Sequence, residues 1–179
     1  MNTTSYASPQ PCGLGKKAVG ELAERISEHT EFQTNPDLDA LVQRLGGKIL
    51  YQDIWELHSS ESGSIEIRDD KDFSITLASH TSKARDRFTI AHELGHYFLH
   101  YRLPKLNGKD TGPLRAARAG NDQAETEANW FAASFLMPEN SFREAFEISN
   151  GDLVVLANKF EVSMSAASVR AKSLGLAAK

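Results

Sequence analysis

TIAHELGHY, residues 89–97, decides the fold of this chain, because it places an HExxH motif on a segment with helical character. In a helix, residues four apart lie on the same face, so His92 and His96 can reach one cation. Two imidazoles at this spacing are typical of a zinc site, and the intervening Glu93 can hold an attacking water. The motif therefore predicts a zinc-dependent hydrolase with Glu93 as its general base.

A hydrolytic zinc site needs a third protein ligand and one open position for water. The extended motif HExxHxxGxxH cannot supply that ligand, since it needs glycine and histidine where this chain has Leu99 and Arg102. A second helix, expected over residues 122–137, offers Glu125 and Glu127 ahead of a face of alanines and phenylalanines. A carboxylate from this helix could lie against the motif helix.

Asn129 favours Glu125 as the third ligand. It follows Glu125 by four residues, and its amide oxygen could accept the second ring N–H of a ligand histidine. Glu127 is then expected in solvent or behind the ligands, although helical spacing alone separates the two glutamates poorly. His100 lies two turns from His92, so we expect it to pack or hydrogen-bond rather than to bind the same ion.

An additional donor should stabilise the oxyanion that forms when a carbonyl is attacked. The candidates for this role, or for a substrate contact, are Tyr97, Arg87, Tyr101 and Arg118. An extended substrate could also pair with the edge of a strand over residues 73–78, if that strand borders the cleft.

Composition limits the class of protein. The chain has 179 residues, 40% hydrophobic and 25% charged, which suits one globular domain, or one domain with a small appendage. It contains no membrane-spanning stretch, no secretory signal and a single cysteine, Cys12, so we expect a cytoplasmic protein without an internal disulfide. The net charge of −4 argues against a general nucleic-acid binder. Nothing in the sequence fixes the oligomeric state.

The pattern along the chain predicts an α+β fold that begins with a flexible leader over residues 1–13. Helices over 14–32 and 36–45 should precede three strands in an antiparallel meander, over 48–55, 64–67 and 73–78. The motif helix should end before Pro104, and residues 103–123 should form a long connection. Gly95 costs this helix about 1 kcal/mol relative to alanine. Close approach of another element would explain the glycine.

The last part of the chain should be helical, over residues 141–148, 152–160 and 163–174. The last two segments look like a helix-turn-helix, whose second helix could enter DNA. That helix offers only Arg170 and Lys172, so a bundle that supports the rest of the chain is favoured over DNA binding.

Two motifs, RFTIAHELGHYFLH at 87–100 and ETEANWFAASFLMP at 125–138, together resemble the ImmA/IrrE family of zinc metallopeptidases. The resemblance covers about residues 35–140. It implies a reduced gluzincin-like zincin, with a small three-stranded antiparallel sheet over two central helices. Residues 14–140 are then the peptidase domain, and residues 141–179 are a helical segment packed on it.

Carried over by position, the resemblance implies zinc on His92, His96 and Glu125, with Glu93 catalytic. Family members typically inactivate a helix-turn-helix repressor, often encoded beside them, and some are grouped with toxin–antitoxin pairs. The implied function is a cytoplasmic zinc metalloendopeptidase that cleaves such a repressor or an antitoxin-like partner and so regulates transcription. The alternative is a regulator that binds the repressor or DNA without proteolysis.

Overall fold

The computed structural model describes residues 5–33, 36–52, 63–117 and 122–176. The first elements are α1 (Lys16–His29), α2 (Leu38–Arg44), β1 (Gly47–Gln52), β2 (Gly63–Asp69) and β3 (Asp72–Ala78). A long helical run follows, made of α3 (Lys83–Gly95), the π-helix η1 (His96–Arg102) and α4 (Leu103–Leu106). The remaining elements are β4 (Leu114–Ala117), α5 (Gln123–Leu136), α6 (Glu139–Ile148), α7 (Leu153–Phe160) and α8 (Met164–Ser173). The α+β class is confirmed.

The sheet has four strands in the order β1-β3-β2-β4, so the prediction of a three-stranded antiparallel meander is wrong. β2 pairs with β3 and β4 antiparallel, whereas β1 pairs with β3 in parallel. A tight turn joins β2 to β3 and imposes antiparallel pairing. The connection from β1 to β3 contains β2 itself, which is long enough for a parallel arrangement. Residues 53–55, expected in the first strand, lie outside the described part.

The sequence does not predict strand β4, because its four residues, LRAA, form a segment too short and too rich in alanine to show a strand pattern. Its outer edge carries Ala7, whose amide donates to Pro113 O while its carbonyl accepts from the amide of Arg115, both at 2.9 Å. From Ala7 onward, the predicted leader is thus hydrogen-bonded to the edge of the sheet. This segment lies along the sheet.

The helical run that carries the motif does not end before Pro104. Helix α3 begins after Ser82, whose hydroxyl accepts from the amide of Arg85 at 3.3 Å, and η1 and α4 continue the run to Leu106. Pro104 lies in the first turn of α4, where its missing N–H costs least. The turns of η1 are wider than those of an α-helix, and such segments often occur at functional sites.

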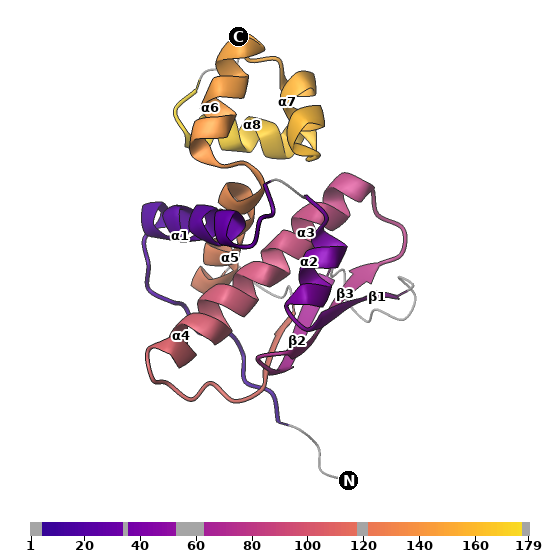
Figure 1. Cartoon of the computed structure of the whole chain (residues 1–179), viewed down its shortest axis with the longest axis vertical. Helices are drawn as coiled ribbons and strands as arrows, with labels where there is room; N and C mark the ends of the chain where they lie inside the picture. The colour runs from indigo at the N-terminus through magenta and orange to yellow at the C-terminus, as the bar shows by residue number, and fades with distance from the viewer. Residues whose placement is uncertain (1–4, 34–35, 53–62, 118–121, 177–179) are drawn as a thin grey trace.

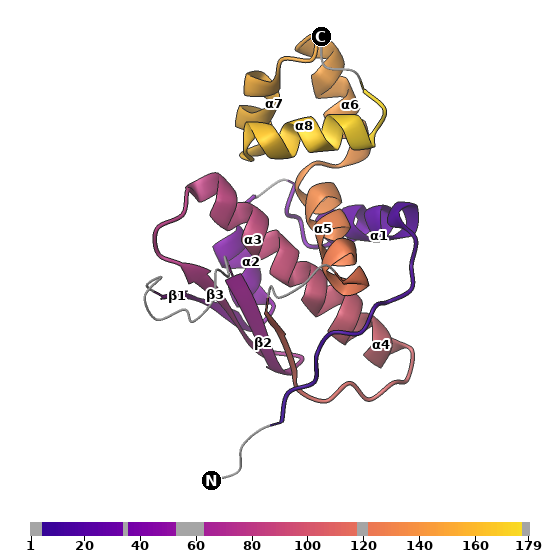
Figure 2. The same cartoon turned by 180° about the vertical axis from the view of Figure 1, so that it is seen from behind.

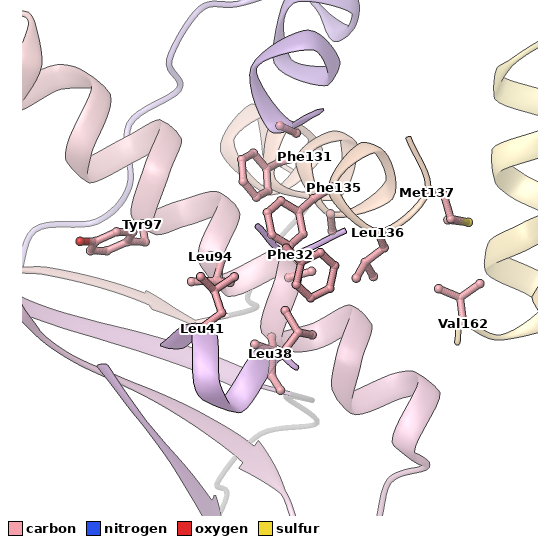
Figure 3. Packing of buried hydrophobic residues seen from close by; sticks show 14 of the residues in the cluster. Phe32, Leu38, Leu41, Leu94, Tyr97, Phe131, Phe135, Leu136, Met137 and Val162 are labelled. Carbon is pink, nitrogen blue, oxygen red and sulfur yellow. The ribbon is translucent and has the colours of Figure 1, made fainter. Parts of the chain in front are cut away.

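Figures 1 and 2 show α3 crossing the middle of the molecule, with the sheet on one side and α1 and α5 on the other. Phe32, Phe131 and Phe135 fill the space beside α3 (Figure 3), with ring centroids 4.6 Å apart for Phe32 and Phe135 and 5.5 Å for Phe131 and Phe135. Burial of each ring stabilises the fold by about 2 kcal/mol. The aromatic cluster therefore fixes α5 relative to the motif helix.

Helices α6, α7 and α8 gather at one end of the molecule (Figure 1). Arg170 of α8 is buried against α5, where its Nε donates to Met137 O at 2.9 Å and its Nη1 donates to Ser134 Oγ at 3.2 Å. One of the two cations on the supposed recognition helix thus points into the protein. Within the described residues, no helix combines the length and apolar character that crossing a bilayer requires.

Candidate active site

Helix α3 and the first residue of η1 present His92, Glu93 and His96, all at most 1% exposed. The i, i+4 spacing brings the Nε2 atoms of the two histidines to 3.2 Å from each other. The Nε2 atoms of both rings therefore lie close enough together to bind one ion.

Helix α5 brings Glu125 to these two atoms. Its Oε2 lies 3.1 Å from His92 Nε2, and its Oε1 lies 3.1 Å from His96 Nε2. The side chain of Asp122 caps α5 by accepting from the amide of Glu125 at 2.9 Å. We call His92, His96 and Glu125 the ligand group.

Close contact between the helices makes this approach possible. A β-carbon on Gly95 would lie 3.1 Å from Ala128 Cα and 3.2 Å from Phe131 Cβ. The expected close approach at Gly95 is confirmed, and its partner is α5. Because the backbones nearly touch here, a carboxylate one turn earlier in α5 reaches the imidazoles of α3.

The spacing of the ligand group fits one zinc ion. A tetrahedral ion with ligands at 2.0–2.2 Å separates neighbouring ligand atoms by about 3.3 Å. The observed separations of 3.1, 3.1 and 3.2 Å are close to that value. The Glu125 side chain is 14% exposed and the histidines 1%, so the group is most open on the glutamate side.

The protonation states also suit a cation. Burial opposes ionisation of Glu125, but hydrogen bonds to His92 and His96 outweigh it and hold the pKa of its carboxyl well below the ordinary value. Burial lowers the pKa of His96, against the opposing effect of Glu125. An ionised carboxylate and neutral imidazoles are the forms that bind metal.

Asn129 contacts the outer nitrogen of His92. Its Oδ1 lies 3.0 Å from His92 Nδ1 and can accept the ring N–H, which leaves the Nε2 lone pair directed at the ligand group. Asn129 thus contacts a histidine of the ligand group, the kind of contact that the sequence predicts for it. Its side chain is exposed to solvent.

Behind His96 lies a set of contacts that the sequence did not reveal. His96 Nδ1 is 3.0 Å from His100 Nδ1, and His100 Nε2 donates to Glu127 Oε2 at 2.9 Å. We call this series, from Glu127 through His100 to His96, the buried chain. The expectation that His100 hydrogen-bonds rather than joins the ligand group is confirmed. Glu127, the alternative ligand, is turned away from that group and is not in solvent.

Glu93 lies beside the first residue of β2. A β-carbon on Gly63 would lie 2.3 Å from Thr89 Cγ2 and 3.4 Å from Glu93 Oε1. The strand therefore passes beside Glu93, and its closeness to Thr89 leaves room only for glycine at this position. Gly63 escaped the sequence analysis because nothing local indicates which strand covers the motif.

The proposed oxyanion or substrate residues lie elsewhere. The Tyr97 hydroxyl donates to Asp70 O at 2.6 Å, and the Tyr101 hydroxyl accepts from Lys105 Nζ at 3.2 Å. Arg87 Nη1 donates to a backbone carbonyl, that of Pro36, at 2.8 Å and lies 3.4 Å from Glu161 Oε2. The structure brings none of these three to the ligand group, and Arg118 lies outside the described residues. The expected substrate edge at residues 73–78 is also wrong, because β3 is paired on both sides.

A groove of about 1080 Å³ adjoins the site between α1, α3, α5 and α8. Phe88, Trp130 and Val169 line it, and so does Asn129, which contacts His92. The ligand group itself does not line it. The groove therefore borders the metal-binding geometry without containing it.

Three comparisons with known proteins indicate the family and the fold of the chain. The family model of peptidase M78, described as the IrrE N-terminal-like domain, matches residues 57–172. Metallopeptidase ImmA of Bacillus subtilis (strain 168) is 34% identical over 65 residues, 36% of this chain and 36% of that protein. A Mycobacterium tuberculosis transcriptional regulator shares the fold with a TM-score of 0.63 and 19% identity, over 86% of this chain and 46% of that one. The chain thus spans less than half the length of either protein.

Proposed function

The chain belongs to the peptidase M78 family, whose model describes an IrrE N-terminal-like domain, and from this premise we propose that the protein is a zinc metallopeptidase. The observation that carries the proposal is the ligand group, whose three ligand atoms lie within 4.8 Å of one another beside the buried Glu93. The glutamate comes from a second helix, which is the arrangement of a gluzincin. Residues 14–140 are the proposed peptidase domain and residues 141–179 the proposed helical segment, whose helices α6, α7 and α8 lie at one end of the molecule.

The residues of the chain divide the chemistry among them. His92, His96 and Glu125 would hold the ion, and when bound, zinc supplies a Lewis acid that polarises a carbonyl and acidifies water. Glu93 would take a proton from the attacking water and return it to the leaving amine. Asn129 would keep the His92 ring oriented while this happens.

The substrate proposal is narrower: a helix-turn-helix repressor or antitoxin-like partner in the cytoplasm. It is supported by the resemblance to family members that act on such repressors. The direct binding of DNA is disfavoured by the inward position of Arg170. A regulator that binds the repressor without cleaving it is the competing function.

The test compares the wild type with Glu93→Gln, each loaded with zinc and assayed for metal content, on a helix-turn-helix repressor that is encoded nearby or that co-purifies with the protein. Mass spectrometry of the products should show a single set of fragments with the wild type and a loss of about 10²- to 10⁴-fold in the variant. Glu28→Gln, an exposed glutamate on α1, is the matched control and should cleave normally. Denatured casein in a parallel arm separates a general peptidase from a specific one.

Two outcomes would contradict the proposal. If neither protein cleaves although the repressor stays bound, the chain is a binding regulator. If Glu93→Gln still relieves repression in cells at wild-type strength, proteolysis is not the function.

A further inference from the structure

The carboxylate of Glu127, beside the ligand group, accepts four hydrogen bonds. Its side chain is fully buried. Oε2 accepts from the amide of Cys12 at 2.8 Å and from His100 Nε2 at 2.9 Å. Oε1 accepts from the amide of Gly13 and from Gln123 Nε2, both at 3.3 Å. Four donors around one buried carboxylate keep it ionised and fix its orientation.

The contacts of His100 determine where its proton lies. A carboxylate only accepts, so His100 Nε2 must carry the proton in the 2.9 Å bond to Glu127. In a neutral imidazole, Nδ1 is then an acceptor. Only one proton fits between His96 Nδ1 and His100 Nδ1, which are 3.0 Å apart, and it must be the proton of His96. His96 therefore keeps its Nε2 lone pair for the ligand group.

We propose that Glu127 and His100 are positioning residues that hold His96 in its metal-binding tautomer. The inference rests on the proposed function in one respect, that His96 binds the ion. It adds that the N-terminal segment belongs to the metal site, since the amides of Cys12 and Gly13 hold the carboxylate at the far end of the buried chain. Substitutions that break the buried chain should leave the three metal ligands in place but weaken the binding of the ion.

A second metal site is the competing interpretation of the same residues. Ligand atoms of Cys12, His100 and Glu127 also lie within 4.8 Å of one another. An ion there would need the lone pair of His100 Nε2, which moves the His100 proton to Nδ1 and obliges His96 to carry its own on Nε2. While His96 and His100 are both neutral and hydrogen-bonded to each other, only one of the two groups of ligands can bind an ion. The four hydrogen bonds on Glu127 favour the buried chain.

The first measurement needs no variant. Ring nitrogen NMR shifts of the zinc-loaded, ¹⁵N-histidine-labelled protein report which nitrogen of each neutral imidazole carries the proton. We expect His100 to carry it on Nε2 and His96 on Nδ1. A proton on Nδ1 of His100 would overturn the proposal.

The second measurement is zinc affinity by chelator competition, with the visible spectrum of the cobalt-substituted protein as a readout of ligand geometry. Glu127→Gln and His100→Leu should each weaken zinc binding about 10- to 100-fold and alter the cobalt bands. Tyr97→Phe is the matched control, since it removes a partly buried hydrogen bond, to Asp70 O, from the residue that follows His96. Its zinc affinity should stay within twofold of the wild type.

Cys12→Ser tests the second metal site, because it removes the thiol and keeps the backbone amide. One zinc per chain and unchanged cobalt bands after the change support the buried chain, whereas a thiolate-to-cobalt charge-transfer band that is lost in Cys12→Ser, or the loss of a zinc ion, would replace it with a second site. Affinities within twofold of the wild type for both Glu127→Gln and His100→Leu would overturn the positioning role. Absence of zinc binding in the wild type would instead refute the proposed function.

Discussion

Gly95 of α3 lies against Ala128 of α5 with no room between them for a side chain, since a β-carbon on Gly95 would be 3.1 Å from Ala128 Cα. This contact sets the distance between the two helices that supply the ligand group. The glycine inside the motif thus serves the geometry of the site at the expense of helix propensity.

Gly95→Ala should separate α3 from α5 by a few tenths of an ångström. Overpacking costs about 1–3 kcal/mol and improved helix propensity returns about 1 kcal/mol, so we expect a net loss of about 1 kcal/mol together with weaker zinc binding. Urea denaturation and chelator competition measure the two effects. Gly15→Ala is the control, because nothing lies within 4 Å of that position. Unchanged zinc affinity in Gly95→Ala would contradict the role of this contact.

Gly63→Ala should disturb the opposite side of the site, because the new methyl would collide with Thr89 Cγ2. We expect a stability loss of about 2 kcal/mol and reduced turnover, with zinc content unchanged. Thr89→Ser removes the colliding methyl, so the double variant should recover most of both losses. A double variant as impaired as Gly63→Ala alone would show that another contact is responsible.

Asn129→Ala should weaken zinc binding less than Glu127→Gln does. Asn129 is exposed, so water can take over its contact with His92, whereas Glu127 is fully buried and water cannot replace it. We expect a loss of about tenfold, at the low end of what such contacts contribute. Parallel chelator titrations of the two variants compare them. A larger loss of zinc affinity in Asn129→Ala than in Glu127→Gln would show that the contact with His92 contributes more to zinc binding than the buried chain does.

The metal-free protein should lose stability as the pH falls below about 6.5. Burial, helped by the neighbouring His96, lowers the pKa of His100 to about 4, so the unfolded chain binds a proton that the folded chain refuses between these values. The contribution of neutral His100 to the free energy of unfolding is fully present above about pH 6.5, and it is lost toward pH 4, by up to about 3 kcal/mol. Urea midpoints at pH 7.5, 6.5, 5.5 and 4.5 measure the slope. The slope should shrink in His100→Leu and persist in His29→Gln, an exposed histidine.

Arg170→Lys should loosen the C-terminal helices. The guanidinium donates to Met137 O and Ser134 Oγ and lies 3.5 Å from Glu24, and an ammonium cannot reproduce this fork. We expect a loss of about 2 kcal/mol in the urea unfolding free energy. Lys172→Ala, exposed on the same helix, should change it by less than about 0.5 kcal/mol. Equal effects from both would mean that Arg170 does not join α8 to α5.

The parts of the site that the sequence predicts are those carried by helical spacing. His92 and His96, and likewise Glu125 and Asn129, are pairs at i, i+4, and each pair points to one side of its own helix. Their meeting could be anticipated because Gly95 and the alanines of α5 indicate a close crossing. The order of the strands could not be anticipated, since β1 pairs with β3 and no local sequence pattern indicates this pairing.

The role of Glu127 depends on partners far away in the chain. Its neighbours in space are His100 and the amides of Cys12 and Gly13, more than a hundred residues earlier in the case of the amides. A backbone amide leaves no trace in the side-chain sequence, so the buried chain became visible only in three dimensions. Helical spacing of α5 alone left Glu125 and Glu127 nearly equivalent.

The bridge between Ala7 and Leu114 anchors one end of the N-terminal segment, and the start of α1 at Lys16 anchors the other. Between these anchors, Cys12 and Gly13 contribute main-chain donors that most side-chain replacements leave intact. The segment is therefore constrained in length more than in composition. Most substitutions here preserve the donors, but adding or deleting a single residue between Ala7 and Lys16 shifts them out of register with Glu127.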